Sequence, residues 1–290
     1  MHGINGRDGR YGSEVCLHGA YYGDNFGDML LLGLFCKWIR GSVDGVAVSL
    51  PFAQERVRCI LGAQYRGFRR LLTANALVYG GGGYFGEQPY NPIRWGYVNL
   101  ARHAPAATVM RARRKPFAII GVGVGPITNI WTRKAVLRAC AAAEVLAVRD
   151  EESYDYLRRI GLRRSDVVIT ADAALTIGEE HNVAAREIEP STMGKQSLRI
   201  GVHLYTPKAM AGIVEPAVVA IHAFVQDHPE TEFVFFDDTS VGLSKEIATL
   251  RNQFMQRWPT RIGYQHYKDV WSLVALIRSL DMVVTTKLHV

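Results

Sequence analysis

The 290-residue sequence lacks the features that mark an exported or membrane-spanning chain. No apolar run approaches the roughly 18 residues that a membrane-spanning helix needs. The glycine-rich and polar start of the chain has no apolar core of the kind found in signal peptides. Only four cysteines are present, and no Cys-x-x-Cys pair occurs among them. These absences predict a cytoplasmic protein with buried, reduced thiols.

Several catalytic signatures are also missing. The sequence has no His-Glu-x-x-His zinc motif, no Gly-x-Ser-x-Gly nucleophile elbow and no P-loop. Cys16 and His18 share one face of a predicted strand, but two ligands do not make a metal site. We therefore predict no bound metal.

The charge balance favours an anionic partner, since the formal net charge is +7. Its densest cationic run is Arg111, Arg113, Arg114 and Lys115. The run is compatible with a solvated loop or with peripheral contact to acidic lipid headgroups at the inner membrane surface. Aromatic residues are not interleaved with it and no nucleic-acid-binding module is present, so we predict no nucleic-acid partner.

Short apolar runs alternate with amphipathic stretches along the chain, which predicts parallel sheets covered by helices. We expect helices over Asn25–Arg40, Thr132–Ala143 and Glu151–Ile160, and later over 213–227, 244–258 and 268–280. The expected strands are Val15–Ala20, Val46–Leu50, Ala76–Tyr79, Phe117–Val124, Val145–Val148, Val167–Thr170, Leu198–Tyr205, Glu232–Phe236, a short one near Ile262 and one at the end of the chain.

This rhythm predicts an α/β protein with two Rossmann-like, doubly wound domains that face a cleft. We place the first domain at residues 14–180, a polar linker at 181–197 and the second domain at 198–290. The second domain ends on a strand, whereas such a strand is normally followed by a covering helix. We therefore expect this domain to be truncated.

Two glycine-containing turns follow early strands. In Gly23–Asp28, Asn25 or Asp28 can cap the next helix, or the helix start can hold an anion. In the second turn, Gly80, Gly81, Gly82 and Gly83 precede Tyr84. The acidic residue of a dinucleotide fingerprint is missing about 20 positions later, so we favour close approach of the backbone to some other ligand.

Further motifs stand at later strand ends. Gly121, Gly123 and Gly125 clear one strand face, either for a ligand or for packing. Arg149 ends a strand and can grip a phosphate or carboxylate with two hydrogen bonds; the alternative is an ion pair with Glu151 or Glu152. Lys287 and His289 share one face of the last strand, which suits anion binding and proton donation.

Taken in order, these segments resemble the polysaccharide pyruvyl transferase family. The similar segments are Gly23–Asp28, Gly80–Gly83, Gly121–Pro126, Arg149–Ser153 with Leu157 and Gly161, Ala171–Ala173 and Thr286–His289. Together they extend from about residue 15 to residue 290. The resemblance implies a GT-B-like fold with the active site between two domains. It also implies transfer of the enolpyruvyl group of phosphoenolpyruvate to two hydroxyls of one sugar, forming a pyruvate ketal on an exopolysaccharide or cell-surface glycan.

The implied site roles follow from that chemistry. Arg149 and Lys287, with the backbone of Gly81, Gly82 and Gly83, are expected to bind phosphoenolpyruvate. His289 is the expected general acid and Asp28 the general base. Asn25 and Tyr84 are expected to contact the saccharide acceptor, free or lipid-linked. The scheme uses phosphoenolpyruvate as a co-substrate and needs no cofactor.

This sequence departs from the family pattern in two places. The family typically has arginine where this chain has Lys287, which keeps the charge but loses the bidentate fork. The family also continues beyond the last motif, so we expect weak activity from a chain that ends at Val290. Two alternatives stay open, namely a nucleotide-sugar glycosyltransferase of GT-B architecture and a non-catalytic, truncated remnant.

Overall fold

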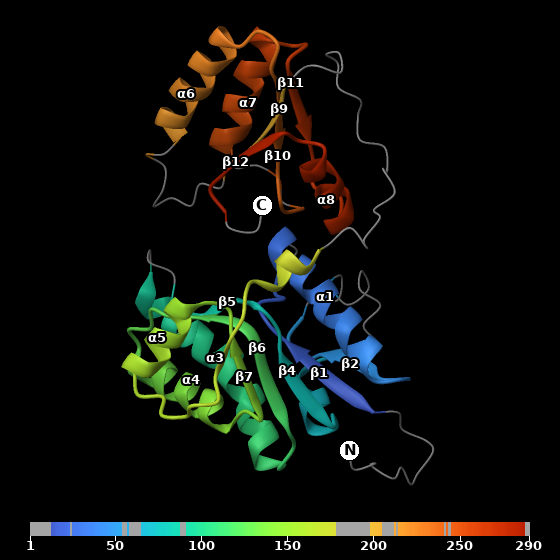
Figure 1. The fold of residues 1–290 in the computed structure, drawn as a ribbon, viewed down its shortest axis with the longest axis vertical. Coiled ribbons are helices and arrows are strands. Elements are labelled where there is room, and N and C mark those ends of the chain that lie inside the picture. The colour runs from blue at the N-terminus through green and yellow to red at the C-terminus, as the bar shows by residue number, and fades with distance from the viewer. Residues whose placement is uncertain are drawn as a thin grey trace. The chain divides into compact units, whose positions relative to one another are not determined.

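The computed structural model describes residues 13–23, 25–53, 57, 65–87, 91–177, 198–204, 212, 214–240, 242 and 245–287. The chain divides into two compact units (Figure 1). Residues 1–23 and 28–176 form the first unit, and residues 24–27 and 177–290 form the second. The predicted linker at 181–197 lies outside the described residues.

The first unit is built on one parallel sheet, with strand order β3-β2-β1-β4-β6-β7-β8 among the described residues and β5 paired to β6. Each of its strand pairs is parallel. From β1 the chain adds β2 and β3 on one side, and from β4 onward it adds strands on the other side. The carboxyl ends of β1 and β4 are therefore a topological switch point. The strands are β1 (Glu14–His18), β2 (Ala47–Leu50), β3 (Tyr65–Arg66), β4 (Ala76–Tyr79), β5 (Gly82–Phe85), β6 (Phe117–Val124), β7 (Val145–Val148) and β8 (Val168–Ile169).

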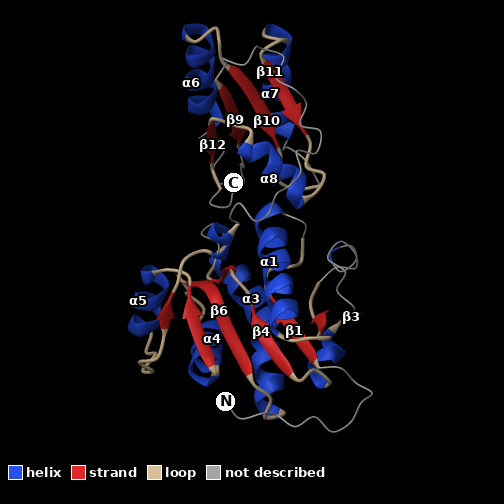
Figure 2. Cartoon of the chain, turned by 45° about the vertical axis from the view of Figure 1, so that its right-hand side comes forward, coloured by secondary structure: helices blue, strands red, loops and turns tan. Residues whose placement is uncertain are grey.

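Helices cover both faces of this sheet (Figure 2). Helix α1 (Phe26–Ser42) lies on one face, and α3 (Pro92–Ala112) and α4 (Ile130–Ala142) lie together on the other. Helix α5 (Glu151–Arg159) packs against β6 and β7. Two short 3₁₀ helices, η1 (Phe68–Leu72) and η2 (Ala173–Thr176), complete the described elements of this unit.

The second unit repeats the same architecture on a smaller scale. Its described strands run parallel in the order β11-β10-β9-β12, so its switch point lies between β9 and β12. The strands are β9 (Arg199–His203), β10 (Glu232–Phe236), β11 (Ile262–Gln265) and β12 (Met282–Thr285), and the helices are α6 (Val214–Asp227), α7 (Lys245–Arg257) and α8 (Val270–Arg278). The predicted α/β class with parallel sheets is confirmed.

Two elements differ from the sequence prediction. The glycine run was expected to be a loop, but Gly82 and Gly83 lie in strand β5. Helix α3 was not expected, because Pro105 interrupts an apolar pattern that lacks helical periodicity. The helix nevertheless begins normally: Asn91 caps it by accepting a hydrogen bond from the Arg94 N–H, and Pro92 occupies the first turn.

Tyr79 explains how α3 continues past its internal proline. This fully buried side chain inserts its hydroxyl into the helix, where it donates to the carbonyl of His103 at 2.7 Å and accepts from the Ala107 N–H at 2.8 Å. Those two backbone groups would otherwise pair with each other across one helical turn. A side chain inserted into the hydrogen-bond ladder is a known way to accommodate a distorted helix.

We expect Tyr79→Phe to lower the free energy of unfolding by about 2 kcal/mol, because it leaves two buried backbone groups without their partner. Denaturant unfolding followed by circular dichroism measures this loss. Tyr97→Phe is the matched control, since Tyr97 lies on the same helix and is 57% exposed. Equal stability of the two variants would show that the helix closes its own hydrogen bond when the hydroxyl is removed.

Candidate active site

The glycines after β4 are explained in part by packing within the first unit. A side chain at Gly80 would meet the hydroxyl of Tyr21 at 2.7 Å. A side chain at Gly81 would press on the carbonyl oxygen of Gly121 and the ring of Phe35, both at 3.3 Å. Gly82 has a φ of 123°, which side chains rarely allow. Close packing at Gly80 and Gly81 and the backbone conformation of Gly82 therefore account for these three positions without a ligand.

Gly83 differs from its neighbours because it is exposed and faces Arg149. A Cβ built on Gly83 would lie 3.9 Å from both terminal nitrogens of the Arg149 guanidinium. On the neighbouring strand, a Cβ built on Gly123 would lie only 2.8 Å from one of them. The structure thus brings together two residues predicted to bind the donor, Gly83 and Arg149, and the missing side chains leave room for the guanidinium.

Two carboxylates engage Arg149. Its Nε lies 3.2 Å from Asp150 Oδ2, and its Nη1 lies 3.6 Å from Asp172 Oδ2. Its partners are therefore not Glu151 or Glu152, the alternative considered from the sequence. Asp150 also caps α5 by accepting from the Ser153 N–H at 2.8 Å. An anionic ligand that binds Arg149 has to compete with these carboxylates.

The predicted acceptor residues and base lie near the start of α1 and in β5. Asn25 and Asp28 are half-buried, the first directly before α1 and the second in its first turn. Tyr84 is buried, and its hydroxyl donates to the carbonyl of Gly80 at 2.7 Å. This geometry gives Tyr84 a packing role and lends no support to its predicted contact with a saccharide.

A buried histidine pair near the β1–β4 switch point was not predicted. His18 Nε2 and His103 Nδ1 lie 2.9 Å apart, and the rings of Tyr79 and Tyr84 surround them. Burial lowers the pKa of His18 to about 3, so its imidazole is neutral at physiological pH. The pair is a polar element of the core.

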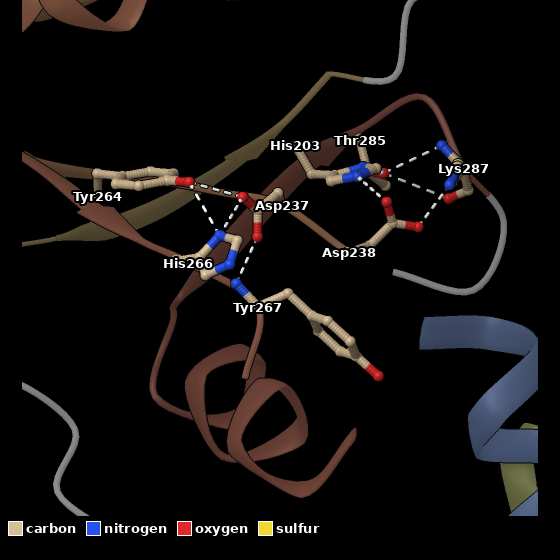
Figure 3. Close-up of polar contacts among 8 residues, drawn as sticks. All are labelled: His203, Asp237, Asp238, Tyr264, His266, Tyr267, Thr285 and Lys287. Carbon is tan, nitrogen blue, oxygen red and sulfur yellow. Dashed lines mark hydrogen bonds and ion pairs between the residues drawn. The ribbon is translucent and has the colours of Figure 1, made fainter. Parts of the chain in front are cut away.

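A polar cluster occupies the switch point of the second unit (Figure 3). His203, the last residue of β9, is buried; its Nδ1 lies 3.1 Å from Thr285 Oγ1 and its Nε2 lies 3.3 Å from Asp238 Oδ1. The other oxygen of Asp238 binds the ammonium of Lys287 at 2.5 Å. The Lys287 N–H donates to Thr285 Oγ1 at 3.0 Å. Three strand ends therefore place one cation in a defined position.

A second cluster is centred on the neighbouring aspartate. Asp237 is buried, and its Oδ2 accepts from the Tyr264 hydroxyl at 2.6 Å and contacts His266 Nδ1 at 2.9 Å. Its Oδ1 accepts from the backbone N–H of Tyr267. Burial and the hydrogen bond to Asp237 raise the pKa of Tyr264 to about 12. Figure 3 shows these contacts tying β10 to β11 and to the segment before α8.

The pKa of Asp238 lies below its ordinary value. Burial alone raises this pKa, but the hydrogen bond with His203 and the positive charge of Lys287 outweigh burial. A carboxylate whose pKa is lower in the folded state stabilises the fold above the pKa of the unfolded chain, near 4, and loses that contribution as the pH falls through the folded value.

We therefore expect the difference in stability between the wild type and Asp238→Asn to be greatest at neutral pH and to shrink below about pH 4. Thermal unfolding of both proteins between pH 7 and pH 3 measures this difference. A difference that is constant across the range would show that the charge of Asp238 does not contribute.

Some sequence predictions fall beyond what the structure describes, and others concern absences. His289, the predicted general acid, lies outside the described residues.

Across the described part of the chain, no group of three or more His, Cys, Asp or Glu side chains could hold a metal ion. No helix in that part is long and apolar enough to cross a membrane. Cys16, Cys36 and Cys140 are buried free thiols, as predicted, whereas Cys59 is not among the described residues.

Comparison with protein-family models shows which family this chain belongs to. The model of polysaccharide pyruvyl transferases matches residues 25–290. The chain belongs to the polysaccharide pyruvyl transferase family. The match includes Arg149, Asp238 and Lys287, and it supports a transferase that acts on a saccharide. A search among curated proteins gives no match for this family member.

Solved structures similar to this pyruvyl transferase family member share its fold. The structure of S. aureus MnaA with UDP is similar at 11% identity and a TM-score of 0.61, covering 96% of this chain and 75% of that one. UDP-GlcNAc 2-epimerase from Neisseria meningitidis, bound to UDP-GlcNAc, is similar at 9% identity and a TM-score of 0.60, covering 96% and 78%. At these identities the likeness shows a GT-B-type fold alone.

Proposed function

We propose that the chain is a pyruvyl transferase that moves the enolpyruvyl group of phosphoenolpyruvate to two hydroxyls of one sugar in an exopolysaccharide or cell-surface glycan. The product is a cyclic pyruvate ketal, and inorganic phosphate is released. Family membership supports the transferase class. The reaction takes place in the cytoplasm and uses phosphoenolpyruvate as its co-substrate.

The Lys287 cluster is the observation that carries this proposal. Ligands of doubly wound sheets bind outside the carboxyl ends of the strands, at the switch point, and Lys287 lies at that place in the second unit. An ammonium has three N–H donors, so it can bind Asp238 and a phosphate oxygen together. The side chain of Lys287 is 24% exposed, which leaves it accessible to a ligand.

Asp238 is a positioning residue in this account. Without it, the four-carbon stem of Lys287 would sample many rotamers, and holding it for a ligand would cost entropy. Asp238 is itself held by His203, which is buried and fixed by Thr285. The chain thus presents Lys287 in a preorganised state, which lowers the cost of binding an anion.

In the proposed reaction two sugar hydroxyls bond to the same carbon of the donor, the first by addition and the second by displacement of phosphate. A proton is delivered to the methylene carbon, and the neighbouring carbon becomes an oxocarbenium-like centre that the first sugar hydroxyl attacks. Attack by the second hydroxyl then closes the ketal, and the C–O bond to phosphate breaks. In this scheme His289 gives the proton, Asp28 accepts a hydroxyl proton, and Lys287 stabilises charge on the phosphate.

The remaining donor and acceptor contacts are also part of the proposal. Arg149 binds an anionic group of the donor in place of one of its two carboxylate partners, next to the exposed backbone of Gly83. Asn25 is the retained candidate for the acceptor sugar, since it lies half-buried just before α1.

Calorimetric titration of the purified chain with phosphoenolpyruvate, and separately with UDP-GlcNAc, tests the choice of donor. We expect saturable binding of phosphoenolpyruvate and none of UDP-GlcNAc at the same concentrations. Inorganic phosphate should compete weakly, because it lacks the carboxylate. Binding of UDP-GlcNAc alone would replace the proposal with a nucleotide-sugar reaction.

A further inference from the structure

The positive charge of the chain is concentrated in one segment. Residues 88–143 contain no aspartate or glutamate, and their net charge of +9 exceeds the +7 of the whole chain. The cations are Arg94, Arg102, Arg111, Arg113, Arg114, Lys115, Arg133, Lys134 and Arg138. This segment forms α3, β6 and α4, so the two helices, which pack against each other, contain no acidic residue.

Four large apolar side chains are exposed where these helices begin. Their exposed fractions are 71% for Ile93, 57% for Tyr97, 49% for Ile130 and 59% for Trp131. The two helix starts are in contact, because Thr132 Oγ1 donates to the carbonyl of Gly96 at 2.6 Å. Gly96 also lies directly against Asn129. We call these four residues the α3–α4 patch.

Cations border this patch, and the carboxylate of Glu87 beside it points inward. The ammonium of Lys134 lies 5.2 Å from the centre of the Trp131 ring, and Arg94 is exposed between Ile93 and Tyr97. Glu87 is buried; its oxygens accept from Thr128 and from the Asn129 N–H at 2.5 to 3.0 Å. The patch therefore combines apolar and aromatic side chains with positive charge.

We propose that the α3–α4 patch docks on a membrane surface that contains acidic phospholipids. Tryptophan and tyrosine favour the interface between headgroups and acyl chains, aliphatic side chains favour the region just below it, and cations are drawn to acidic headgroups. A protein partner for this surface would have to supply acidic groups around an apolar centre, whereas an acidic bilayer supplies both everywhere. The proposal does not depend on the transfer reaction.

This surface is distinct from the basic run at 111–115. Helix α3 has 21 residues, a length of about 31 Å, so the run lies at the far end of the helix from Ile93. Part of the run also has a structural use, because Arg113 donates to the carbonyls of Leu71 and Ala74, both at 2.8 Å.

Sedimentation with vesicles tests the proposal in the absence of phosphoenolpyruvate. We expect the chain to bind vesicles of phosphatidylcholine with phosphatidylglycerol and to bind pure phosphatidylcholine at least tenfold more weakly. The double variant Ile93→Ser/Trp131→Ser should lose at least tenfold in binding to the acidic vesicles. Lys134→Gln should lose roughly fivefold.

Matched controls keep the result specific. Leu175→Ser/Val219→Ser removes two apolar side chains of similar exposure elsewhere, 77% and 64%, and Lys245→Gln removes an exposed lysine of α7. These variants should bind like the wild type. Equal binding by patch and control variants would overturn the proposal. So would light scattering that shows the patch variants changing a wild-type dimer into a monomer without vesicles, because the patch would then join two copies of the chain.

Discussion

Lys287→Ala is expected to weaken the binding of phosphoenolpyruvate by roughly 30- to 150-fold. A charge-assisted hydrogen bond between an ammonium and a phosphate is worth about 2–3 kcal/mol, and alanine removes it entirely. The loss should be seen in the dissociation constant measured by calorimetry. The fold should be retained, because Lys287 follows β12 and is itself partly exposed.

Two further variants separate charge from position. Lys287→Arg keeps the charge and restores the residue typical of the family, so phosphoenolpyruvate should bind at least as tightly as to the wild type. Lys268→Ala removes an exposed lysine of the same unit and should have no effect. If Lys287→Ala and Lys268→Ala bind phosphoenolpyruvate equally well, Lys287 does not contact the donor.

Asp237→Ala is expected to lower the free energy of unfolding by about 3 kcal/mol. The substitution leaves the Tyr264 hydroxyl, a ring nitrogen of His266 and the Tyr267 N–H without their common acceptor. Buried groups that lose a charged hydrogen-bond partner carry a desolvation cost of this size. Denaturant unfolding monitored by tryptophan fluorescence measures the change.

Glu230→Ala provides the comparison for this stability effect. Glu230 lies in the same unit, and its side chain is 60% exposed, so its removal should change stability by less than about 0.5 kcal/mol. Asp237→Asn should fall between the two, because an amide keeps one oxygen acceptor. If Asp237→Ala and Glu230→Ala unfold at the same denaturant concentration, the second cluster does not hold β10 and β11 together.

The α/β fold could be predicted because its signals are local. Apolar strands such as Phe117–Val124, and helices such as α5 with its Asp150 cap, can be recognised from short stretches of sequence. Helix α3 could not be predicted in this way. Its hydrogen-bond ladder depends on the hydroxyl of Tyr79, which comes from a strand more than 20 residues earlier in the sequence.

The candidate site was predictable only in part, for a similar reason. Motifs at strand ends identified Arg149 and Lys287, because a cation after an apolar strand stands out. Their acidic partners were missed: Asp172 reaches Arg149 from the segment after β8, and Asp238 contacts Lys287, which lies 49 positions later in the sequence. The pair Asp237-Asp238 directly after β10 was the available signal, since two carboxylates at a strand end are costly unless they have partners.

Detection of the reaction product tests the central claim most directly. The chain is incubated with phosphoenolpyruvate and a set of oligosaccharides that carry neighbouring hydroxyl pairs, and products are analysed by mass spectrometry together with released phosphate. The account predicts a saccharide heavier by one pyruvic acid less one water, formed in equal amount to phosphate and reduced in Lys287→Ala. Turnover of UDP-GlcNAc with no such product from phosphoenolpyruvate would contradict it.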